Sequence, residues 1–331
     1  MLSEKDNFLR ALRGDVPEYV PRYNFFWRLQ PSINDGERVN GIGKDPFGVE
    51  WIKEGSSIDG AIPRNDRFIL DDITKWRDVI KFPDYSHVDW EALAKKDASN
   101  WNPAYPRGFK QTTLGFFQSL MSFMGFTEGL MACFEEPDEV KALINYLCDC
   151  YLEYADKCLQ YYTPDFIGYG DDIATERAPF ISLDAFRDIF APVWRRYISF
   201  FKDRGYLAVH HNCGRFEPFV DDLVDMGFNL WEPAQSSNDL VAVKKRHGNK
   251  LIISGGFDTQ MFLPHNDVSE EEIRTATKTL MDNLAPGGGF AFMPPGSSSA
   301  SAPGTPEAEI QKQRVDWVTD EYEKLKFTYY N

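Results

Sequence analysis

The sequence is poor in positive charge and has no long apolar run. Lys and Arg number 36 against 51 Asp and Glu, which gives a net charge of -15. This balance argues against nucleic-acid binding, because a phosphate backbone attracts clustered basic side chains. No stretch of eighteen apolar residues occurs, and residues 1–15 show an amphipathic helical pattern instead of a signal peptide. We therefore expect a cytoplasmic protein without membrane spans.

Cysteine is also scarce, with five residues in the whole chain. Cys133, Cys148, Cys150 and Cys158 all fall in a segment with a helical pattern, and their spacing is not paired. An odd number of unpaired cysteines is typical of reduced thiols in the cytosol. We expect these four residues to be structural and only Cys213 to have a chemical role.

The second half of the chain alternates short apolar runs with amphipathic helical stretches. Five such units follow one another between residue 165 and the end of the chain, which predicts parallel strands with right-handed crossovers. We expect an α/β fold, a single (β/α)8 TIM-type barrel over residues 1–331. Residues 111–331 are its regular part, and residues 1–110 are an irregular extension. The expected features are a first strand at 21–27, a hairpin excursion at 45–51 and 63–70, a second strand at 111–115, and helices at 116–162, 183–204, 216–226, 238–246, 270–284 and 305–326.

The segment AVHHNCGR, residues 208–215, carries the strongest chemical signal. A predicted strand ends here, and side chains two apart on a strand share a face, so His211 and Cys213 can converge on one ion. Nitrogen and sulfur are ligands that zinc favours. Glu232 ends the next predicted strand and offers a third ligand. The alternatives to a metal site are that Cys213 is a buried structural cysteine and that Glu232 caps a helix or lies in a solvated loop.

Polar residues also end the other predicted strands of this half. In a barrel of this type, reactive groups lie at the carboxyl ends of the strands. Tyr169, Asp171, Asp172 and Asp258 are candidates for orienting a substrate or moving a proton, and Met293 begins the turn after the last strand. The alternative for Asp171 or Asp172 is that it caps the following helix, and the alternative for Asp258 is that it caps a turn. His210 faces away from His211 on a strand, so we expect it to pack or to form hydrogen bonds.

The order of several segments resembles the uroporphyrinogen decarboxylase superfamily over nearly the whole chain. The similar segments include KDPFGVEW, PDFIGYGDD, HHNCGR, DMGFNLWEP and KLIISGGFD. The resemblance implies a barrel fold and two main branches, metal-free porphyrinogen decarboxylases and corrinoid-linked zinc methyltransferases. The decarboxylases have an arginine-rich motif after the first VP, where this chain has PRYNFFWRLQPS with Arg28 out of register.

The methyltransferase branch is the more similar of the two. Its zinc ligands correspond to His211 and Cys213, and Glu232 falls near a carboxylate ligand of related methionine synthases. The branch usually supplies another cysteine after the last strand, but residues 293–304 here contain none. Either a serine such as Ser297 substitutes for that cysteine, or the position is left for the substrate, as a catalytic zinc requires.

We therefore expect a zinc-dependent methyltransferase that works with a corrinoid protein. Loss of the cysteine lowers the negative charge on zinc, which favours demethylation of an aryl methyl ether over activation of a thiol. The aromatic segment near the barrel entrance suits a planar substrate, although core packing explains it equally well; the expected substrate contacts are Phe25, Trp27, Arg28 and Met293. A metal-free decarboxylase, another lyase and a non-catalytic corrinoid-binding partner are the alternatives, and homodimerisation is left open.

Overall fold

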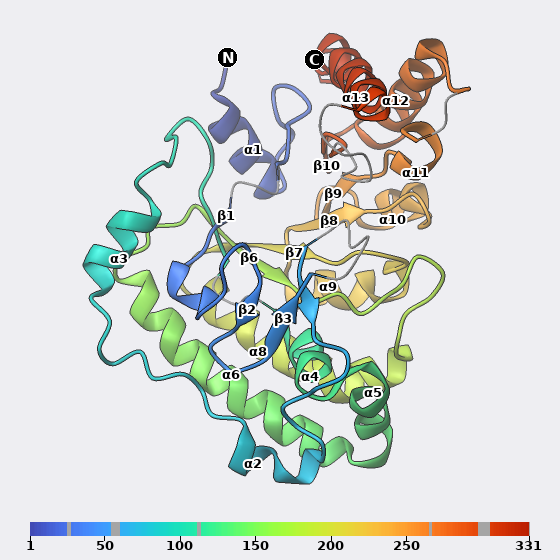
Figure 1. Ribbon diagram of the computed structural model, residues 1–331. Helices are drawn as coiled ribbons and strands as arrows, with labels where there is room; N and C mark the ends of the chain where they lie inside the picture. Colours follow the sequence, from blue (N-terminus) through green and yellow to red (C-terminus); the bar gives the residue numbers. More distant parts are fainter. Residues whose placement is uncertain (25–27, 54–59, 111–113, 265–266, 297–304, 331) are drawn as a thin grey trace.

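Seven parallel strands form the central sheet of the protein, a computed structural model that describes residues 1–24, 28–53, 60–110, 114–264, 267–296 and 305–330 (Figure 1). Each neighbouring pair in this sheet is parallel, in the order β1-β5-β6-β7-β8-β9-β10. The strands are β1 (Arg28–Leu29), β5 (Gly108–Lys110), β6 (Phe166–Gly170), β7 (Leu207–His211), β8 (Leu230–Ala234), β9 (Ile252–Gly255) and β10 (Phe290–Ala291).

The two ends of this strand order are joined by a single parallel bridge between Arg22 and Phe292. The amide of Tyr23 donates to the carbonyl of Phe292 at 2.8 Å, and the amide of Phe292 donates to the carbonyl of Pro21 at 2.8 Å. The expected TIM-type α/β fold is thus present, with seven strands instead of eight in this sheet over the described residues.

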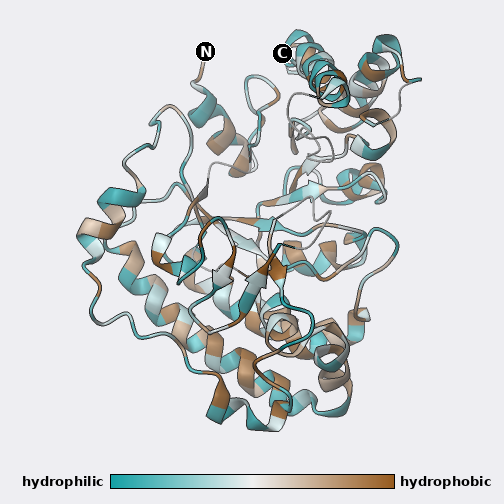
Figure 2. Ribbon diagram, in the orientation of Figure 1, coloured by the Kyte–Doolittle hydropathy of each residue, from teal (hydrophilic) through white to brown (hydrophobic). Residues whose placement is uncertain are grey.

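Helices connect the strands as the sequence pattern predicts. The connection from β5 to β6 contains α4 (Phe116–Met124), α5 (Phe126–Glu135) and α6 (Pro137–Leu159), in which Pro137 occupies the first turn. In Figure 2, brown stretches interrupt the teal of α6, as expected for a helix with one buried face. The later helices are α7 (Leu183–Ala185), the π-helical turn η3 (Phe186–Phe190), α8 (Ala191–Lys202), α9 (Val220–Met226), α10 (Leu240–His247), α11 (Thr259–Phe262), α12 (Glu270–Leu284) and α13 (Pro306–Leu325).

Two expectations for the first half need correction. The second strand is β5, at Gly108–Lys110, and not at 111–115, of which 111–113 lie outside the described residues. The first strand is assigned at Arg28–Leu29, after the expected segment 21–27. The excursion is present as a separate antiparallel sheet of β2 (Gly43–Lys44), β3 (Glu50–Ile52) and β4 (Ile62–Pro63). Short helices η1 (Ser32–Asp35), η2 (Ile73–Lys75), α2 (Trp76–Val79) and α3 (Trp90–Asp97) complete this half.

Alternate residues of the strands β6 to β10 belong to two separate cores. The larger core lies between strands and outer helices and includes Ile167, Trp231 and Ile253. The smaller core takes the other face of the strands and is sealed by α1 (Glu4–Leu12). Its members are Phe8, Leu9, Ala11, Leu12, Tyr23, Phe166, Val209, Leu230, Ile252 and Ala291. Because side chains alternate along a strand, this smaller core identifies which positions point into the barrel.

Among the described residues, none of the helices is both long and apolar enough to cross a bilayer.

Candidate metal centre

The carboxyl ends of β6, β7 and β8 bring the main candidate residues together. These strands are neighbours, and Gly170 pairs with His211, which in turn pairs with Glu232. Asp172 follows β6, and Cys213 follows β7. Parallel strands end at one edge of a sheet, so residues that are far apart in the sequence meet there.

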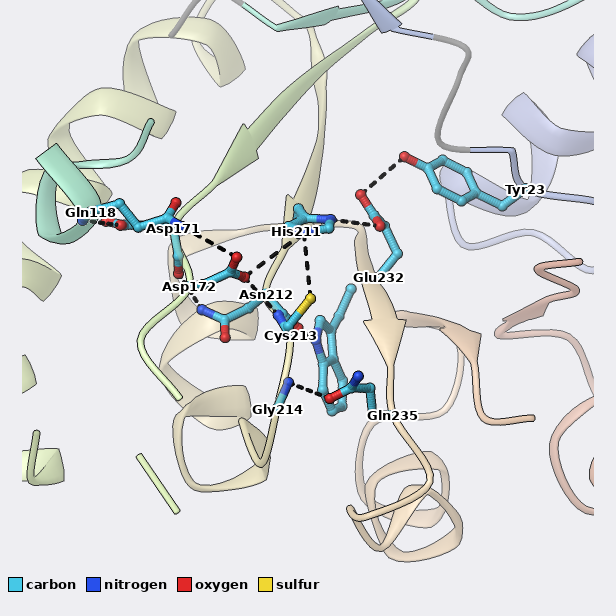
Figure 3. A network of polar contacts seen from close by, with 11 residues as sticks. Tyr23, Gln118, Asp171, Asp172, His211, Asn212, Cys213, Gly214, Glu232 and Gln235 are labelled. Atoms are coloured by element: carbon cyan, nitrogen blue, oxygen red, sulfur yellow. Dashed lines mark hydrogen bonds and ion pairs between the residues drawn. The ribbon is translucent and has the colours of Figure 1, made fainter. Parts of the chain in front are cut away.

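Asp172, His211 and Cys213 form a group that could hold a metal ion, with ligand atoms all within 4.8 Å of one another. The Nε2 atom of His211 lies 3.7 Å from the Sγ atom of Cys213 and 3.8 Å from the Oδ1 atom of Asp172 (Figure 3). Tetrahedral zinc with bonds of about 2.0–2.3 Å separates its ligand atoms by roughly 3.3–3.6 Å. The three side chains are half-buried, so a fourth ligand has access.

Glu232 lies on the other side of the His211 imidazole. Its Oε2 atom is 2.9 Å from Nδ1 of His211, and its Oε1 atom accepts a hydrogen bond from the Tyr23 hydroxyl at 3.3 Å. The glutamate side chain is completely buried, whereas that of His211 is 27% exposed. Glu232 is the middle residue of β8 and does not end the strand as expected. It contacts the expected histidine, but it is not one of the three clustered residues. A carboxylate on one ring nitrogen sets the tautomer and orients the other nitrogen for a metal.

The carboxylate of Asp172 is held in place by two donors. The backbone amide of Cys213 donates to Oδ1 at 2.7 Å, and the side-chain amide of Gln118 donates to Oδ2 at 3.2 Å. Gln118 is in the first turn of α4, 54 residues away from Asp172 in the sequence. No sequence motif indicated Gln118, because its position depends on how α4 packs against the end of β6.

A glycine turn fixes the position of Cys213. Gly214 has a φ of 80°, and a Cβ atom added there would lie 2.5 Å from the carbonyl oxygen of Thr175. The Gly214 amide donates to the side chain of Gln235 at 2.6 Å, and its carbonyl accepts from the side chain of Asn238 at 3.0 Å. A residue with a side chain cannot take this place without displacing the backbone.

Asp171 and Tyr169 serve the scaffold next to the centre. The Asp171 carboxylate is fully buried and accepts four hydrogen bonds, from the amides of Phe117 and Gln118, the hydroxyl of Tyr169 and the indole of Trp194. Burial raises the pKa of Asp171 to about 7, against the lowering effect of those two amides and the hydroxyl. The capping alternative therefore applies to α4, which precedes Asp171; the following helix α7 is capped by Ser182 instead.

His210 packs as expected on the opposite face of β7 from His211. Its ring lies among those of Tyr169, Trp194, Phe216 and Phe228, at centroid distances of 4.8–5.9 Å. Neither ring nitrogen has a hydrogen-bond partner among the described residues. Burial, followed by the proximity of His211, lowers the pKa of His210 to about 3.

The remaining candidates are more distant or only partly described. Asp258 is the N-cap of α11 and accepts from the Met261 amide at 2.9 Å, as its capping alternative predicts. Met293 follows the bridge residue Phe292 and is half-buried. Phe25 and Trp27 lie outside the described residues, as does Ser297. The backbone of Arg28 pairs with that of Gly108.

Two comparisons relate this chain to known proteins. Residues 113–313 match the family model described as uroporphyrinogen decarboxylase (URO-D). A methyltransferase from Methanosarcina mazei has a similar structure, with a TM-score of 0.66 and 14% sequence identity over 98% of this chain and 99% of that chain. This second similarity shows the fold.

Two other results do not bear on the family or the fold. The GH18 chitinase ChiB from the chitin utilization locus of Flavobacterium johnsoniae has a TM-score of 0.34 and 11% identity, over 75% of this chain and 84% of that chain. No curated protein matches the sequence. The family match spans more than half of the sequence and includes the ends of β6, β7 and β8, and the chain therefore belongs to the uroporphyrinogen decarboxylase (URO-D) family.

Proposed function

We propose that this protein is a zinc-dependent methyltransferase that moves a methyl group between a small substrate and the cobalt of a separate corrinoid protein. The observation that carries the proposal is the convergence of His211 Nε2, Cys213 Sγ and an Asp172 carboxylate oxygen within 4.8 Å. Nitrogen, thiolate sulfur and carboxylate oxygen together form a ligand set that suits zinc and leaves one tetrahedral position open. The overall fold shared with the methyltransferase from Methanosarcina mazei supports this choice.

In this proposal Asp172 is the third ligand, and Glu232 orients His211. The Asp172 oxygen lies 3.8 Å from the same ring nitrogen that faces Cys213, whereas Glu232 contacts the opposite nitrogen at 2.9 Å. The sequence suggested Glu232 as the third ligand and Asp172 as a residue that orients the substrate or moves a proton. A buried carboxylate on Nδ1 keeps the proton there, so Nε2 presents its lone pair toward Cys213 and Asp172.

The substrate that fits best is an aryl methyl ether. Bound by these ligands, zinc supplies Lewis acidity that makes the ether oxygen a better leaving group. A carboxylate donates less electron density to zinc than a soft thiolate does, so the Lewis acidity of the ion is kept higher than with two thiolates. The half-buried position of the three side chains leaves the substrate oxygen room to approach.

The chain offers a less suitable site for a porphyrinogen decarboxylase. A substrate with many carboxylates needs several cationic partners. The segment after the first VP contains only two arginines among aromatic residues, and the chain as a whole has a net charge of -15. A corrinoid protein is therefore the proposed partner and a methyl group the proposed cargo.

Metal analysis and methyl transfer test the proposal together. We expect about one zinc per chain, and methyl transfer from a methoxylated aromatic compound to a reduced corrinoid protein, read from the corrinoid absorption spectrum. His211→Ala, Cys213→Ser and Asp172→Asn should each lower zinc content and transfer. His247→Ala is a matched control, because His247, at the end of α10, pairs with Asp221 of α9 and is not part of the cluster.

Two results would contradict the proposal. Protein without stoichiometric zinc that still transfers methyl groups would remove the role of the metal. Zinc-loaded protein that releases CO₂ from a porphyrinogen, and does not demethylate any methoxylated aromatic, methylamine or methylthiol, would indicate the decarboxylase alternative.

A further inference from the structure

The two ends of the strand order meet at a narrow seam, which consists of residues 21–23 and Phe292. In the described part of the chain this seam contains a single residue pair, Arg22 with Phe292, whereas neighbouring strands of the central sheet have two to five pairs. Two backbone hydrogen bonds hold it, from the Tyr23 amide to the Phe292 carbonyl and from the Phe292 amide to the Pro21 carbonyl, both at 2.8 Å. A pairing this short opens locally more easily than the long pairings of the sheet.

Tyr23 connects this seam with the candidate metal centre. Its backbone lies in the seam, and its side chain is completely buried in the smaller core, where its ring centroid lies 5.7 Å from that of Phe8. The hydroxyl donates to Oε1 of Glu232 at 3.3 Å, and Oε2 of the same carboxylate lies 2.9 Å from Nδ1 of His211. In Figure 3, the Glu232 carboxylate lies between the tyrosine hydroxyl and the imidazole. A chain of contacts thus runs from the seam to a candidate metal ligand.

The groups in this chain of contacts depend on one another for their positions. The Glu232 side chain is completely buried, so the loss of a hydrogen-bond donor to its carboxylate is costly. The carboxylate of a glutamate turns easily about its last bond, whereas the tyrosine ring is rigid and is held in a packed core. The orientation of the Glu232 oxygens therefore depends on where the Tyr23 hydroxyl lies. The hydroxyl in turn depends on the seam, which holds the tyrosine backbone.

We propose that Tyr23 is a positioning residue that couples metal binding at the candidate centre to the pairing of the seam. The inference rests on the metal-binding part of the proposed function. When His211 binds a divalent ion through Nε2, its ring loses electron density, so the Nδ1 proton becomes a stronger donor to Glu232 and holds the carboxylate more firmly. The carboxylate then fixes the Tyr23 hydroxyl, and the seam opens less often. Coupling between two sites is reciprocal, so an open seam weakens metal binding in its turn.

Hydrogen exchange of the seam amides tests this coupling. The full-length chain is measured by mass spectrometry with fragmentation to single residues, first without metal and then with zinc. The amides of α12, which packs against α13, report how far bound zinc stabilises the chain as a whole. Relative to these amides, we expect zinc to slow the exchange of the Tyr23 and Phe292 amides at least about fivefold, as for a coupling of ordinary size.

Tyr23→Phe should remove this additional slowing, because the ring remains and only the hydroxyl that reaches Glu232 is lost. Zinc should still bind, but several-fold more weakly, because the support of the ligating histidine is loosened. Tyr322→Phe is the matched control. It removes another buried tyrosine hydroxyl beside the seam, which donates to the Val20 carbonyl at 3.0 Å, and its ring stacks on Phe292 with the centroids 4.1 Å apart. Zinc should slow the seam amides of this control as much as those of the unmodified protein.

Two results would overturn the inference. The first is a zinc-loaded chain whose seam amides slow no more than those of α12, and the second is additional slowing that persists in Tyr23→Phe. The comparison with α12 is made within one sample, so the unmodified protein gives an answer even if that variant does not fold.

Zinc content and methyl transfer are measured on the same preparations. A chain that binds zinc and shows the slowing, but does not transfer methyl groups, refutes only the methyltransferase. An active zinc protein whose seam does not respond to the metal refutes only the coupling.

Discussion

The buried carboxylate of Glu232 contacts the partly exposed imidazole of His211, with Oε2 2.9 Å from Nδ1. This pair fixes the ring so that Nε2 faces Cys213 and Asp172 (Figure 3). The arrangement resembles the carboxylate–histidine pairs that support zinc ligands in other proteins.

Replacing Glu232 by Gln should weaken zinc binding without removing the site. We expect zinc affinity to fall about 10- to 100-fold, because the imidazole loses its charged partner but all three clustered ligand atoms remain. Competition with a zinc chelator measures this affinity. Asp172→Asn is the informative comparison, and it should have the larger effect. If the order is reversed, Glu232 is the ligand that the sequence suggested.

Gly214→Ala should disturb the centre through its backbone. The added methyl group would approach the Thr175 carbonyl oxygen to 2.5 Å, so the turn that carries Cys213 must move. Gly205→Ala is a matched control, because Gly205 has a φ of 83° and a Cβ atom there would meet no atom within 4 Å. The control should cost about 1 kcal/mol from the unfavourable φ alone. We expect Gly214→Ala to unfold at a clearly lower temperature than the control and to bind less zinc; equal behaviour of both variants would contradict this reading of the turn.

Asp171→Asn should lower the stability of the protein but leave its zinc content unchanged. An asparagine has one acceptor oxygen, so at least one of the four groups that donate to Asp171 is left without a partner. We expect a loss of about 1–3 kcal/mol in the free energy of unfolding, measured by urea denaturation. Asp138→Asn, at a 99% exposed side chain, should cost almost nothing. Loss of zinc at unchanged stability would instead place Asp171 in the reactive centre.

His210→Phe should be tolerated. The imidazole nitrogens lack partners in an aromatic environment, and an apolar ring of similar shape removes that cost. We expect the free energy of unfolding to change by less than about 1.5 kcal/mol, as for other volume-conserving changes. His210→Ala should lose several kcal/mol, because it leaves a cavity. Thermal unfolding of both variants checks this, and a Phe variant as unstable as the Ala variant would show that a nitrogen has a partner.

Local sequence signals predicted most of the regular structure. Helix α12 begins and ends at the residues expected from its pattern, because Ser269 and Glu272 form a capping box that marks its start. The strand ends near Asp172 and His211 were also predicted, since apolar runs bounded by glycine and polar residues are distinctive. The strand that contains Glu232 was predicted too, but it ends two residues later, at Ala234. The first two strands were misplaced, because aromatic and polar residues there obscure the periodicity.

The contacts inside the centre could not be predicted in the same way. Asp172 follows β6 and Glu232 lies in β8, which are the two strands beside β7, and the sequence does not tell which side of the His211 ring each carboxylate occupies. That choice depends on partners far away in the chain. Gln118 is 54 residues from Asp172, and Tyr23 is 209 residues from Glu232. The packing of the strands and helices against one another brings these residues together.

Helix α1 has a consequence for the order of events during turnover. The amino-terminal end of the barrel is filled by Phe8, Leu9, Ala11 and Leu12 of this helix, so a ligand cannot reach His211 from that side. In the proposed methyl transfer, a small methyl donor and a bulky corrinoid protein would then share the opposite opening. The docked corrinoid protein would cover this opening. We therefore expect the small molecule to enter before the protein docks and to leave after the protein departs.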